Sequence, residues 1–301
     1  MEDLIFILVV GSMGLVFAIC LRASFAAYKA GFRNYRFKVS ELFCFFFGLV
    51  GLFCFAYGLY EPYTLEVSKI QIQSSKLVHG KELRIVHLSD LHSDGIERLE
   101  SRLPSEIAKL HPDLIVFTGD SANNRDGLKL FRKFIAETSE IAPTYAVYGN
   151  HDSRGGRDWD IYGQTGVHLL NGNIENLDVR GTKVFLTGIA VDNEYAINKA
   201  LAKVPHEAFS IFLYHYPAGV DAAVANNVDL FCCGHTHGGQ VRLPFYGAVV
   251  TNSLKGKQYE AGLYKVNRTS TYVSRGIGMI GLPIRFMAPP EIAVIEVQSA
   301  N

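Results

Sequence analysis

The sequence lacks an excess of charge of either sign. It contains 29 Lys and Arg residues and 29 Asp and Glu residues, so its formal net charge is zero. No basic stripe interleaved with aromatic residues occurs after position 60. Proteins that bind nucleic acids usually carry a surplus of positive charge, because phosphate contacts supply much of their affinity. We therefore expect no nucleic-acid partner.

The sequence is also poor in cysteine. Cys20, Cys44 and Cys54 lie in the apolar first 60 residues, and Cys232 and Cys233 are neighbours in an apolar run. This spacing provides no disulfide framework, so we expect the five thiols to be small core residues. The remaining residues, 61–301, are enough for one domain with a sizeable core that needs no cross-links.

Charged residues are absent from two stretches near the N-terminus, residues 4–21 and 42–60. Each stretch has about the length that a helix needs to cross a bilayer. The start, Met1-Glu2-Asp3, lacks the basic segment of a cleaved signal peptide. We therefore predict a two-helix transmembrane hairpin over residues 1–60, followed by a separate domain over residues 61–301. A hairpin buried in a protein core is the alternative.

The charges beside these stretches predict an orientation. Lys29, Arg33, Arg36 and Lys38 lie between the two stretches, whereas no basic residue precedes the first. The positive-inside rule then places the connecting loop in the cytoplasm and both chain ends outside. We expect a multi-pass protein of the cytoplasmic membrane whose domain faces the extracytoplasmic side. A re-entrant or interfacial hairpin is the alternative.

After a short polar connection from Glu61, apolar runs alternate with amphipathic stretches. The pattern predicts strands at residues 83–88, 114–117, 145–148, 262–266, 272–274 and 292–297, helices at 103–110 and 128–138, and a hairpin of strands 174–179 and 184–189. This order is typical of an α/β or α+β fold in which helices cover mixed sheets.

Polar residues with metal-binding side chains follow five of the apolar runs. They are Asp90 and His92, Asp120, Asn150 and His151, His215, and His235 and His237. Ligands bind at the carboxyl ends of strands in such sheets, so we expect these side chains to meet at one site. A buried, unpaired carboxylate costs several kcal/mol, roughly, and metal ions remove that cost. Mixed carboxylate, amide and imidazole ligands suit manganese, iron or zinc.

These residues and their motifs resemble the calcineurin-like metallophosphoesterases. The resemblance covers residues 83–297 and includes Asp90-x-His92, Gly119-Asp120, Gly149-Asn150-His151-Asp152, His215 and Gly234-His235-Thr236-His237. Segments 89–93, 234–240, 262–264 and 289–292 make the chain similar to a bacterial membrane-associated branch, which includes exported phosphoesterases and UDP-2,3-diacylglucosamine pyrophosphohydrolases of lipid A biosynthesis. One segment departs from that branch: residues 121–124 read Ser-Ala-Asn-Asn instead of apolar residues and an acidic one.

The resemblance implies a four-layer sandwich of two mixed sheets flanked by helices. It also implies a site for two divalent ions, Mn²⁺ in first place and iron or zinc as alternatives. Asp90, His92, Asp120 and His237 would hold one ion, and Asp120, Asn150, His215 and His235 the other. Asp120 would bridge the two ions, and His151 would be the catalytic histidine. Asp152 either orients a histidine or caps a turn.

The implied activity is hydrolysis of a phosphodiester or pyrophosphate bond by water that two metal ions activate. The substrate would be a phosphorylated small molecule or a lipid-linked compound at the membrane or cell envelope. A UDP-2,3-diacylglucosamine pyrophosphohydrolase is one alternative, and a non-catalytic membrane protein that retains the metal site is another. Arg275 and Arg285, in a glycine-rich late segment, could contact a substrate phosphate, with structural pairing as the alternative.

Overall fold

A computed structural model describes residues 2–31, 33–153, 159–205 and 207–300, with side chains from residue 14 onward. The chain divides into two compact units, residues 1–60 and residues 61–301.

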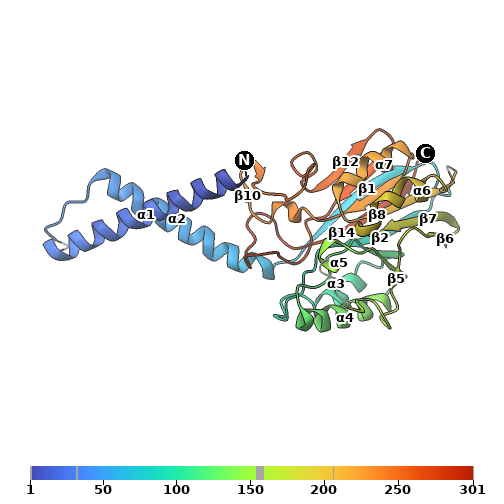
Figure 1. Ribbon diagram of the computed structural model, residues 1–301, viewed down its shortest axis with the longest axis horizontal. Coiled ribbons are helices and arrows are strands. Elements are labelled where there is room, and N and C mark those ends of the chain that lie inside the picture. Colours follow the sequence, from blue (N-terminus) through green and yellow to red (C-terminus); the bar gives the residue numbers. More distant parts are fainter. Residues whose placement is uncertain (1, 32, 154–158, 206, 301) are drawn as a thin grey trace. The chain divides into compact units, whose positions relative to one another are not determined.

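The first unit consists of two helices, α1 (Glu2–Ala30) and α2 (Val39–Tyr60), shown in blue in Figure 1. Small residues lie where the two helices contact each other. Ala23 and Ala27 of α1 are buried, and a Cβ atom added at Gly48 of α2 would lie 3.6 Å from the Cys20 Sγ atom. Small side chains at such contacts allow helices to approach closely, as membrane helices commonly do.

Among the described residues, one helical segment is long and apolar enough to cross a membrane. It is Val39–Tyr63, which comprises α2 and a short 3-10 helix, Glu61–Tyr63. Large apolar side chains of α2 such as Phe46, Leu49 and Phe53 are exposed, which is untypical of a helix in a protein core. The other predicted span, residues 4–21, extends over side chains outside the described part. The two-span hairpin therefore stays a prediction.

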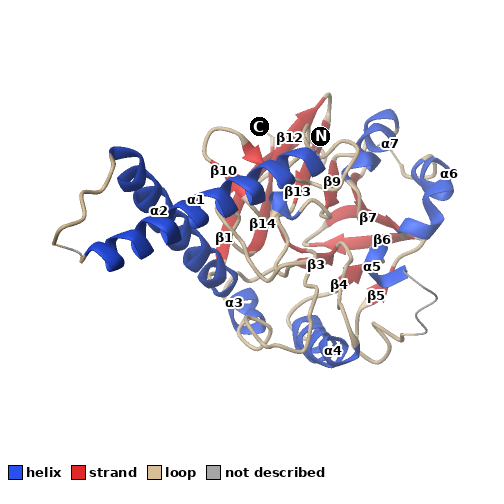
Figure 2. Ribbon diagram, turned by 60° about the vertical axis from the view of Figure 1, so that its left-hand side comes forward, coloured by secondary structure: helices blue, strands red, loops and turns tan. Residues whose placement is uncertain are grey.

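The second unit contains two six-stranded mixed sheets (Figure 2). In spatial order, the first sheet has β1 (Glu66–Ser74), β14 (Glu291–Ser299), β2 (Glu82–Leu88), β3 (Leu114–Phe117), β4 (Thr144–Ala146) and β5 (His168–Leu169). The second has β12 (Gly262–Val266), β13 (Thr269–Val273), β9 (Leu230–Cys233), β8 (Phe209–Tyr214), β7 (Thr182–Ile189) and β6 (Ile174–Val179). A two-stranded ribbon pairs β10 (Arg242–Leu243) with β11 (Gly247–Ala248).

Neighbouring strands run parallel where the site is built. β2, β3, β4 and β5 are parallel in the first sheet, and β7, β8, β9 and β13 are parallel in the second. The carboxyl ends of each parallel group therefore lie at one edge of its sheet, where the loops leave a crevice for ligands.

Alternating side chains on the strands build the layers. Ile85 of β2 packs into the core between the two sheets, whereas the next residue, Val86, packs against the helices on the outer face. Leu213 of β8 likewise faces the other sheet, and its neighbour Phe212 faces outward. Helices α3 (Leu103–Ala108) and α4 (Arg125–Ser139) cover the first sheet, and α6 (Ile197–Leu201) and α7 (Val220–Ala225) cover the second. The predicted sandwich of two mixed sheets flanked by helices is confirmed.

Strand β1 was not expected, because residues 66–74 were assigned to a polar connection. Six of its nine residues are polar, and the interior strand β14 is its parallel partner, from Glu66 opposite Glu291 to Ser74 opposite Ser299. Only Ile70 and Ile72 are buried in it. An edge strand with one apolar face has a weak local signal, and its partner here is more than 200 positions away.

Candidate metal centre

The predicted ligands come from loops at the carboxyl ends of five strands. Asp90 and His92 follow β2, Asp120 follows β3, His215 follows β8, and His235 and His237 follow β9; Asn150 opens the short helix α5 (Asn150–Ser153) after β4. The structure brings these side chains together where the two sheets meet. Asp90, His92, Asp120 and His215 are all exposed by 2% or less.

Five of these seven residues have a left-handed backbone, with φ angles of 51° at Asp90, 44° at His92, 61° at Asp120, 70° at His235 and 53° at His237. This conformation is unfavourable for residues other than glycine, at about 1–3 kcal/mol each, and it clusters at functional sites. The tight reversal aims each side chain back across the strand end. The loops therefore hold these side chains in place with a backbone conformation that lowers stability.

Glycines permit the close approach of the loops. A Cβ atom at Gly119 would lie 2.4 Å from the Gly149 nitrogen, and one at Gly234 would lie 2.1 Å from Asp90 Oδ2. Any larger residue at these positions would push the loops apart. The glycines of the Gly-Asp, Gly-Asn-His and Gly-His motifs thus have a steric role.

Asp120 occupies the centre of the cluster. Its Oδ2 atom lies 3.3 Å from His92 Nε2 and 3.3 Å from His215 Nε2, so the carboxylate stands between two imidazoles from different sheets. Asp90 Oδ1 lies 3.4 Å from His237 Nε2, and 4.0 Å from each of the other two imidazoles. Asp120 therefore lies within reach of imidazoles from both sheets.

Several nitrogen and oxygen lone pairs converge on one point near His215. Its Nδ1 atom lies 2.7 Å from the Thr118 carbonyl, which can only accept, so Nε2 of the neutral ring carries a lone pair. His235 Nε2 likewise donates to the Asn252 carbonyl at 3.0 Å, which leaves a lone pair on His235 Nδ1. These two nitrogens are 3.2 Å apart, and Asn150 Oδ1 is 3.0 Å from His215 Nε2. A metal ion, or a proton on His215 Nε2, would relieve the repulsion between acceptors that face each other at this range.

The side chains around His92 form a second group whose ring-nitrogen and carboxylate lone pairs also face one another. His92 Nδ1 is 2.7 Å from Asn123 Oδ1, and the Asn123 amide group donates to the His92 and Met279 carbonyls, which fixes its orientation. His92 Nε2 therefore points its lone pair at the carboxylates. It is buried without a hydrogen-bond partner, as is His237 Nδ1. Asp90, His92 and His237 form one group with ligand atoms within 4.8 Å of one another, and Asp120, His215 and His235 form another. The donors fit a dinuclear divalent metal site.

Burial and mutual charge shape the protonation of the chain's own groups. Burial raises the pKa of Asp120, but His215 and His92 outweigh it and hold this pKa well below its usual value. Burial lowers the pKa of His215, but the Asp120 charge and hydrogen bond raise it to about 9. Burial lowers the pKa of His237 to about 3 and also lowers that of His235. The site thus holds an ionised Asp120 beside neutral His235 and His237, the forms that bind metal ions. The raised pKa values of His215 and His92 mean that a metal ion must displace a proton from these two rings.

His151 lies beside this cluster. Its backbone N–H donates to Asp120 Oδ1 at 2.7 Å, and its ring packs edge-on against His92 with centroids 4.7 Å apart. Its ring nitrogen also falls within 4.8 Å of ligand atoms of His92 and Asp120, so the distances permit either a ligand or a proton donor.

A cavity of about 560 Å³ opens next to the cluster. Its lining combines the site residues Asp120, Asn150, His151, His235 and His237 with Glu194, Tyr216, Ala218, Asn252, Ser253, Leu254 and Ile280. A volume of this size is typical of small-molecule sites. The cavity is therefore the candidate substrate site.

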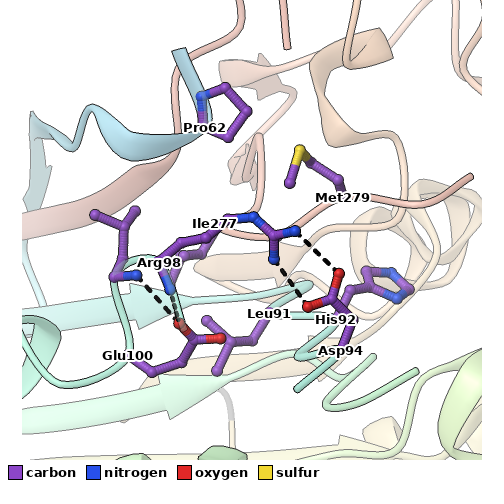
Figure 3. A pocket seen from close by; sticks show the side chains of 10 residues that line it. Pro62, Leu91, His92, Asp94, Arg98, Glu100, Ile277 and Met279 are labelled. Atoms are coloured by element: carbon purple, nitrogen blue, oxygen red, sulfur yellow. Dashed lines mark hydrogen bonds and ion pairs between the residues drawn. The ribbon is translucent and has the colours of Figure 1, made fainter. Parts of the chain in front are cut away.

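A much smaller cavity, of about 20 Å³, is lined in part by His92 (Figure 3). Its walls include Pro62, Ile277 and Met279, and the figure shows Arg98 forming two ion-pair contacts with Asp94. This volume corresponds to about one water molecule, so the cavity has no room for a substrate.

The two arginines predicted to contact substrate are engaged by the chain itself. Arg285 is fully buried and donates to the carbonyls of Arg275, Gly276, Gly278 and Ala288. The Arg275 guanidinium lies 3.2 Å from Glu66 and 3.1 Å from Glu291. These contacts match the structural alternative, and neither residue is among the described residues that line the larger cavity.

Asp152 joins two of the site loops. Its carboxylate accepts the backbone N–H groups of Gly149 at 2.8 Å, Asp120 at 2.8 Å and Ser121 at 2.9 Å. The carboxylate therefore closes its own turn and also ties that turn to the Asp120 loop.

Two further residues that orient imidazoles were not predicted from the sequence: Asn123, which orients His92, and Asn252, which orients His235. One sequence feature could have identified Asn123, namely the departure of residues 121–124 from the pattern of the membrane-associated branch.

Comparison with known proteins identifies the family. The sequence profile described as calcineurin-like phosphoesterase matches residues 83–239, the segment that carries all five site loops. The chain belongs to this family. Its members are hydrolases of phosphoester bonds, and so this chain is a hydrolase that acts on ester bonds.

Three relatives show how far the similarity extends. An uncharacterized metallophosphoesterase of Bacillus subtilis, YkuE, is 35% identical over 80% of this chain and 88% of its own length. The phosphodiesterase YaeI of Escherichia coli is 28% identical over 71% of this chain and 81% of its own. A transmembrane protein with a metallophosphoesterase domain from Danio rerio is 27% identical over 78% of this chain but only 58% of its own.

Proposed function

We propose that this phosphoesterase hydrolyses a phosphodiester or pyrophosphate bond of a membrane-associated or envelope-associated substrate, using water activated by two divalent ions. The observation that carries the proposal is the convergence of carboxylate, amide and imidazole lone pairs around Asp120, beside a cavity lined by His151. The phosphodiesterase name of the Escherichia coli relative supports the bond type.

The chain's own residues hold and orient the ions in this proposal. Asp90, His92 and His237 would hold one ion, Asn150, His215 and His235 would hold the other, and Asp120 lies within reach of both groups. When bound, two divalent ions would lower the pKa of a water molecule and stabilise the attacking and leaving oxygens. Asn123, Thr118 and Asn252 fix the imidazole orientations through hydrogen bonds of 2.7, 2.7 and 3.0 Å. The donor set suits Mn²⁺ in first place, with iron or zinc as alternatives.

His151 is the proposed general acid. It lines the cavity, and a hydrogen bond from its backbone to Asp120 fixes its position. From there its ring can donate a proton to the leaving oxygen of a bound phosphoester, which removes the need to expel an alkoxide.

The domain is proposed to face the extracytoplasmic side of the cytoplasmic membrane, behind a two-span hairpin. The apolar segment Val39–Tyr63 and the name of the Danio rerio relative support a membrane location. The basic residues between the two apolar stretches support the orientation.

A UDP-2,3-diacylglucosamine pyrophosphohydrolase is the second candidate. Leu254 and Ile280 form an apolar part of the cavity wall next to the metal ligands, which suits a substrate with acyl chains. This candidate requires the domain to face the cytoplasm, where nucleotide sugars are made.

The test uses the purified full chain in detergent micelles. We expect two bound divalent ions by metal analysis, loss of activity on chelation, and the strongest recovery with Mn²⁺. A panel of an aryl phosphodiester, an aryl phosphomonoester and a UDP-linked acyl sugar distinguishes the candidates. One ion or none in active protein contradicts the two-metal proposal. Two bound ions without hydrolysis of any substrate would favour the non-catalytic alternative.

A further inference from the structure

Large apolar side chains are exposed on three segments of the second unit near the cavity. They are Leu243 (46% exposed), Phe245 (111%), Tyr246 (51%), Leu254 (104%), Leu282 (64%) and Met287 (47%). Isolated exposed apolar residues are ordinary, but a group of this size marks an interaction surface. We call these six residues the apolar rim.

Hydrogen bonds fasten the segments of the apolar rim to one another. The Gln240 amide donates to the carbonyls of Ile280 and Leu282 at 3.1 and 3.0 Å, and the Arg242 nitrogen donates to the Phe286 carbonyl at 2.9 Å. Lys257, three residues after Leu254, donates to the Tyr246 and Ala248 carbonyls. The rim is thus one built surface. In Figures 1 and 2, its strand β10 lies at the opposite end of the second unit from β6.

The rim lies close to the point where the chain leaves the apolar segment Val39–Tyr63. Glu61 is buried, with its carboxylate against the backbone N–H groups of Met287 and Ala288. A few residues later, the Glu66 nitrogen donates to the Pro290 carbonyl at 2.9 Å. Because Glu61 follows α2 directly in the chain, a helix that crosses the bilayer must bring residues 287 and 288 to the bilayer surface.

The aromatic residues of the rim and a neighbouring lysine suit a membrane–water interface. The Lys257 side chain is half exposed beside its partner Glu260. The fully buried Arg285 and the paired Arg275 contribute no charge to this surface. The Lys257 ammonium lies 3.9 Å above the Tyr246 ring, so it can stay at headgroup level while the ring enters the interface. Aromatic side chains such as Phe245 and Tyr246 are typical of membrane–water interfaces.

We propose that the apolar rim docks into the interface of the membrane that residues 39–63 cross, and that the metal centre thereby takes the phosphoester of a membrane lipid. The lipid assignment rests on the hydrolase activity proposed above, whereas the docking does not. Leu254 connects the two parts, because it belongs to the rim and also lines the cavity beside His235. A headgroup phosphate can then reach the site while its acyl chains remain against the rim.

The experiment measures bilayer contact in the full chain, reconstituted into phosphatidylglycerol-containing vesicles with dibrominated acyl chains. The single tryptophan is first removed as Trp159→Phe, and Phe245→Trp then places the reporter on the rim. Val78→Trp is the matched control, since Val78 is also exposed (48%) but follows the far end of β1, roughly 26 Å of extended chain from Glu66. We expect blue-shifted emission and at least twofold bromine quenching for Phe245→Trp, and neither effect for Val78→Trp.

Equal quenching at both positions, or at neither, overturns the docking proposal. Blue-shifted emission without bromine quenching also overturns it, because the rim would then contact a second copy of the chain.

Hydrolysis is measured separately with Phe245→Asp and Leu282→Asp. We expect a tenfold or greater loss on vesicle-embedded phospholipid, but less than a twofold change on a soluble aryl phosphodiester. An equal loss on both substrates overturns the lipid assignment. Absence of both activities in the unmutated chain contradicts the proposed function instead, whatever the quenching shows.

Discussion

Adjacent asparagines in the Asp120 loop have different roles. Asn123 Oδ1 orients the His92 ring, whereas the Asn124 side chain accepts the Gly127 N–H at 2.8 Å and caps α4. The membrane-associated branch that the sequence resembles usually has an acidic residue in this segment. Here a neutral amide holds the imidazole, which makes His92 a weaker electron donor than a carboxylate partner would.

Substitution of the two asparagines separates metal binding from folding. We expect Asn123→Ala to weaken metal binding by about 10- to 100-fold, because His92 loses the group that fixes its ring. Asn124→Ala should leave metal affinity unchanged and lower the free energy of unfolding by about 0.5–2 kcal/mol, as for a lost helix cap. Metal titration of the apo protein and denaturant unfolding measure the two effects. A similar loss of metal affinity in both variants would contradict the assignment.

A second pair of substitutions separates the bridging ligand from the catalytic histidine. Asp120→Asn removes the negative charge between two imidazoles, so metal content and activity should fall together. His151→Ala should retain its metals and lose roughly 100- to 10,000-fold in turnover, the usual effect of removing one general acid. The deficit should shrink for substrates with good leaving groups, which need little protonation.

His79→Ala, at an exposed histidine outside the site, is the control for this pair. Loss of metals in His151→Ala would make His151 a ligand, in keeping with its distances to His92 and Asp120. Full activity of His151→Ala on a poor leaving group would also contradict the assigned role.

At the scale of elements, the site depends on loops that nearly touch. The turn after β9 passes so close to the turn after β2 that only glycine fits at position 234, and the His235 N–H donates to Asp90 Oδ2 at 3.0 Å. Asp152 likewise joins the turns after β3 and β4, because its carboxylate accepts a backbone N–H group from each. The arrangement of the candidate ligands is thus set by contacts between loops from different strands and different sheets.

Gly234→Ala tests this packing. The added methyl group would lie 2.0 Å from Ser89 Oγ and 2.1 Å from Asp90 Oδ2, so the two loops must separate and Asp90 must move. We expect loss of one or both metals and at least a 100-fold loss of activity, measured by metal analysis and turnover. Gly51→Ala in α2 is the matched control, because its methyl group would meet nothing within 4 Å. Normal metal content in Gly234→Ala would show that the loops tolerate separation.

For the whole molecule, the proposed membrane topology predicts the side on which the C-terminus lies. A reporter fused after Asn301 should show an extracytoplasmic location, because Lys29, Arg33, Arg36 and Lys38, between the apolar stretches, favour a cytoplasmic loop. A second fusion within residues 31–38 should give the opposite signal and serves as the control. A cytoplasmic signal after Asn301 would reverse the topology and move the UDP-linked substrate to first place.

The sequence by itself determined the family, the residues that converge at the candidate metal centre, and most strands. Local patterns carry this information: apolar runs of strand length end in Asp, His or Asn, and glycines stand where loops must approach. The hairpin of residues 174–179 and 184–189 was predictable for the same reason, since β6 and β7 pair across a short turn.

Only the tertiary structure decided the features that depend on partners far apart in the chain. Strand β1 forms because β14, more than 200 residues later, offers a parallel neighbour. Arg285 is occupied by four carbonyls of a folded loop, which no local pattern reveals. The roles of Asn123, Asn252 and the apolar rim depend on residues that folding brings beside them. Short-range periodicity determines which helices and strands form. Long-range packing determines how the candidate ligands are oriented and which apolar side chains gather at the rim.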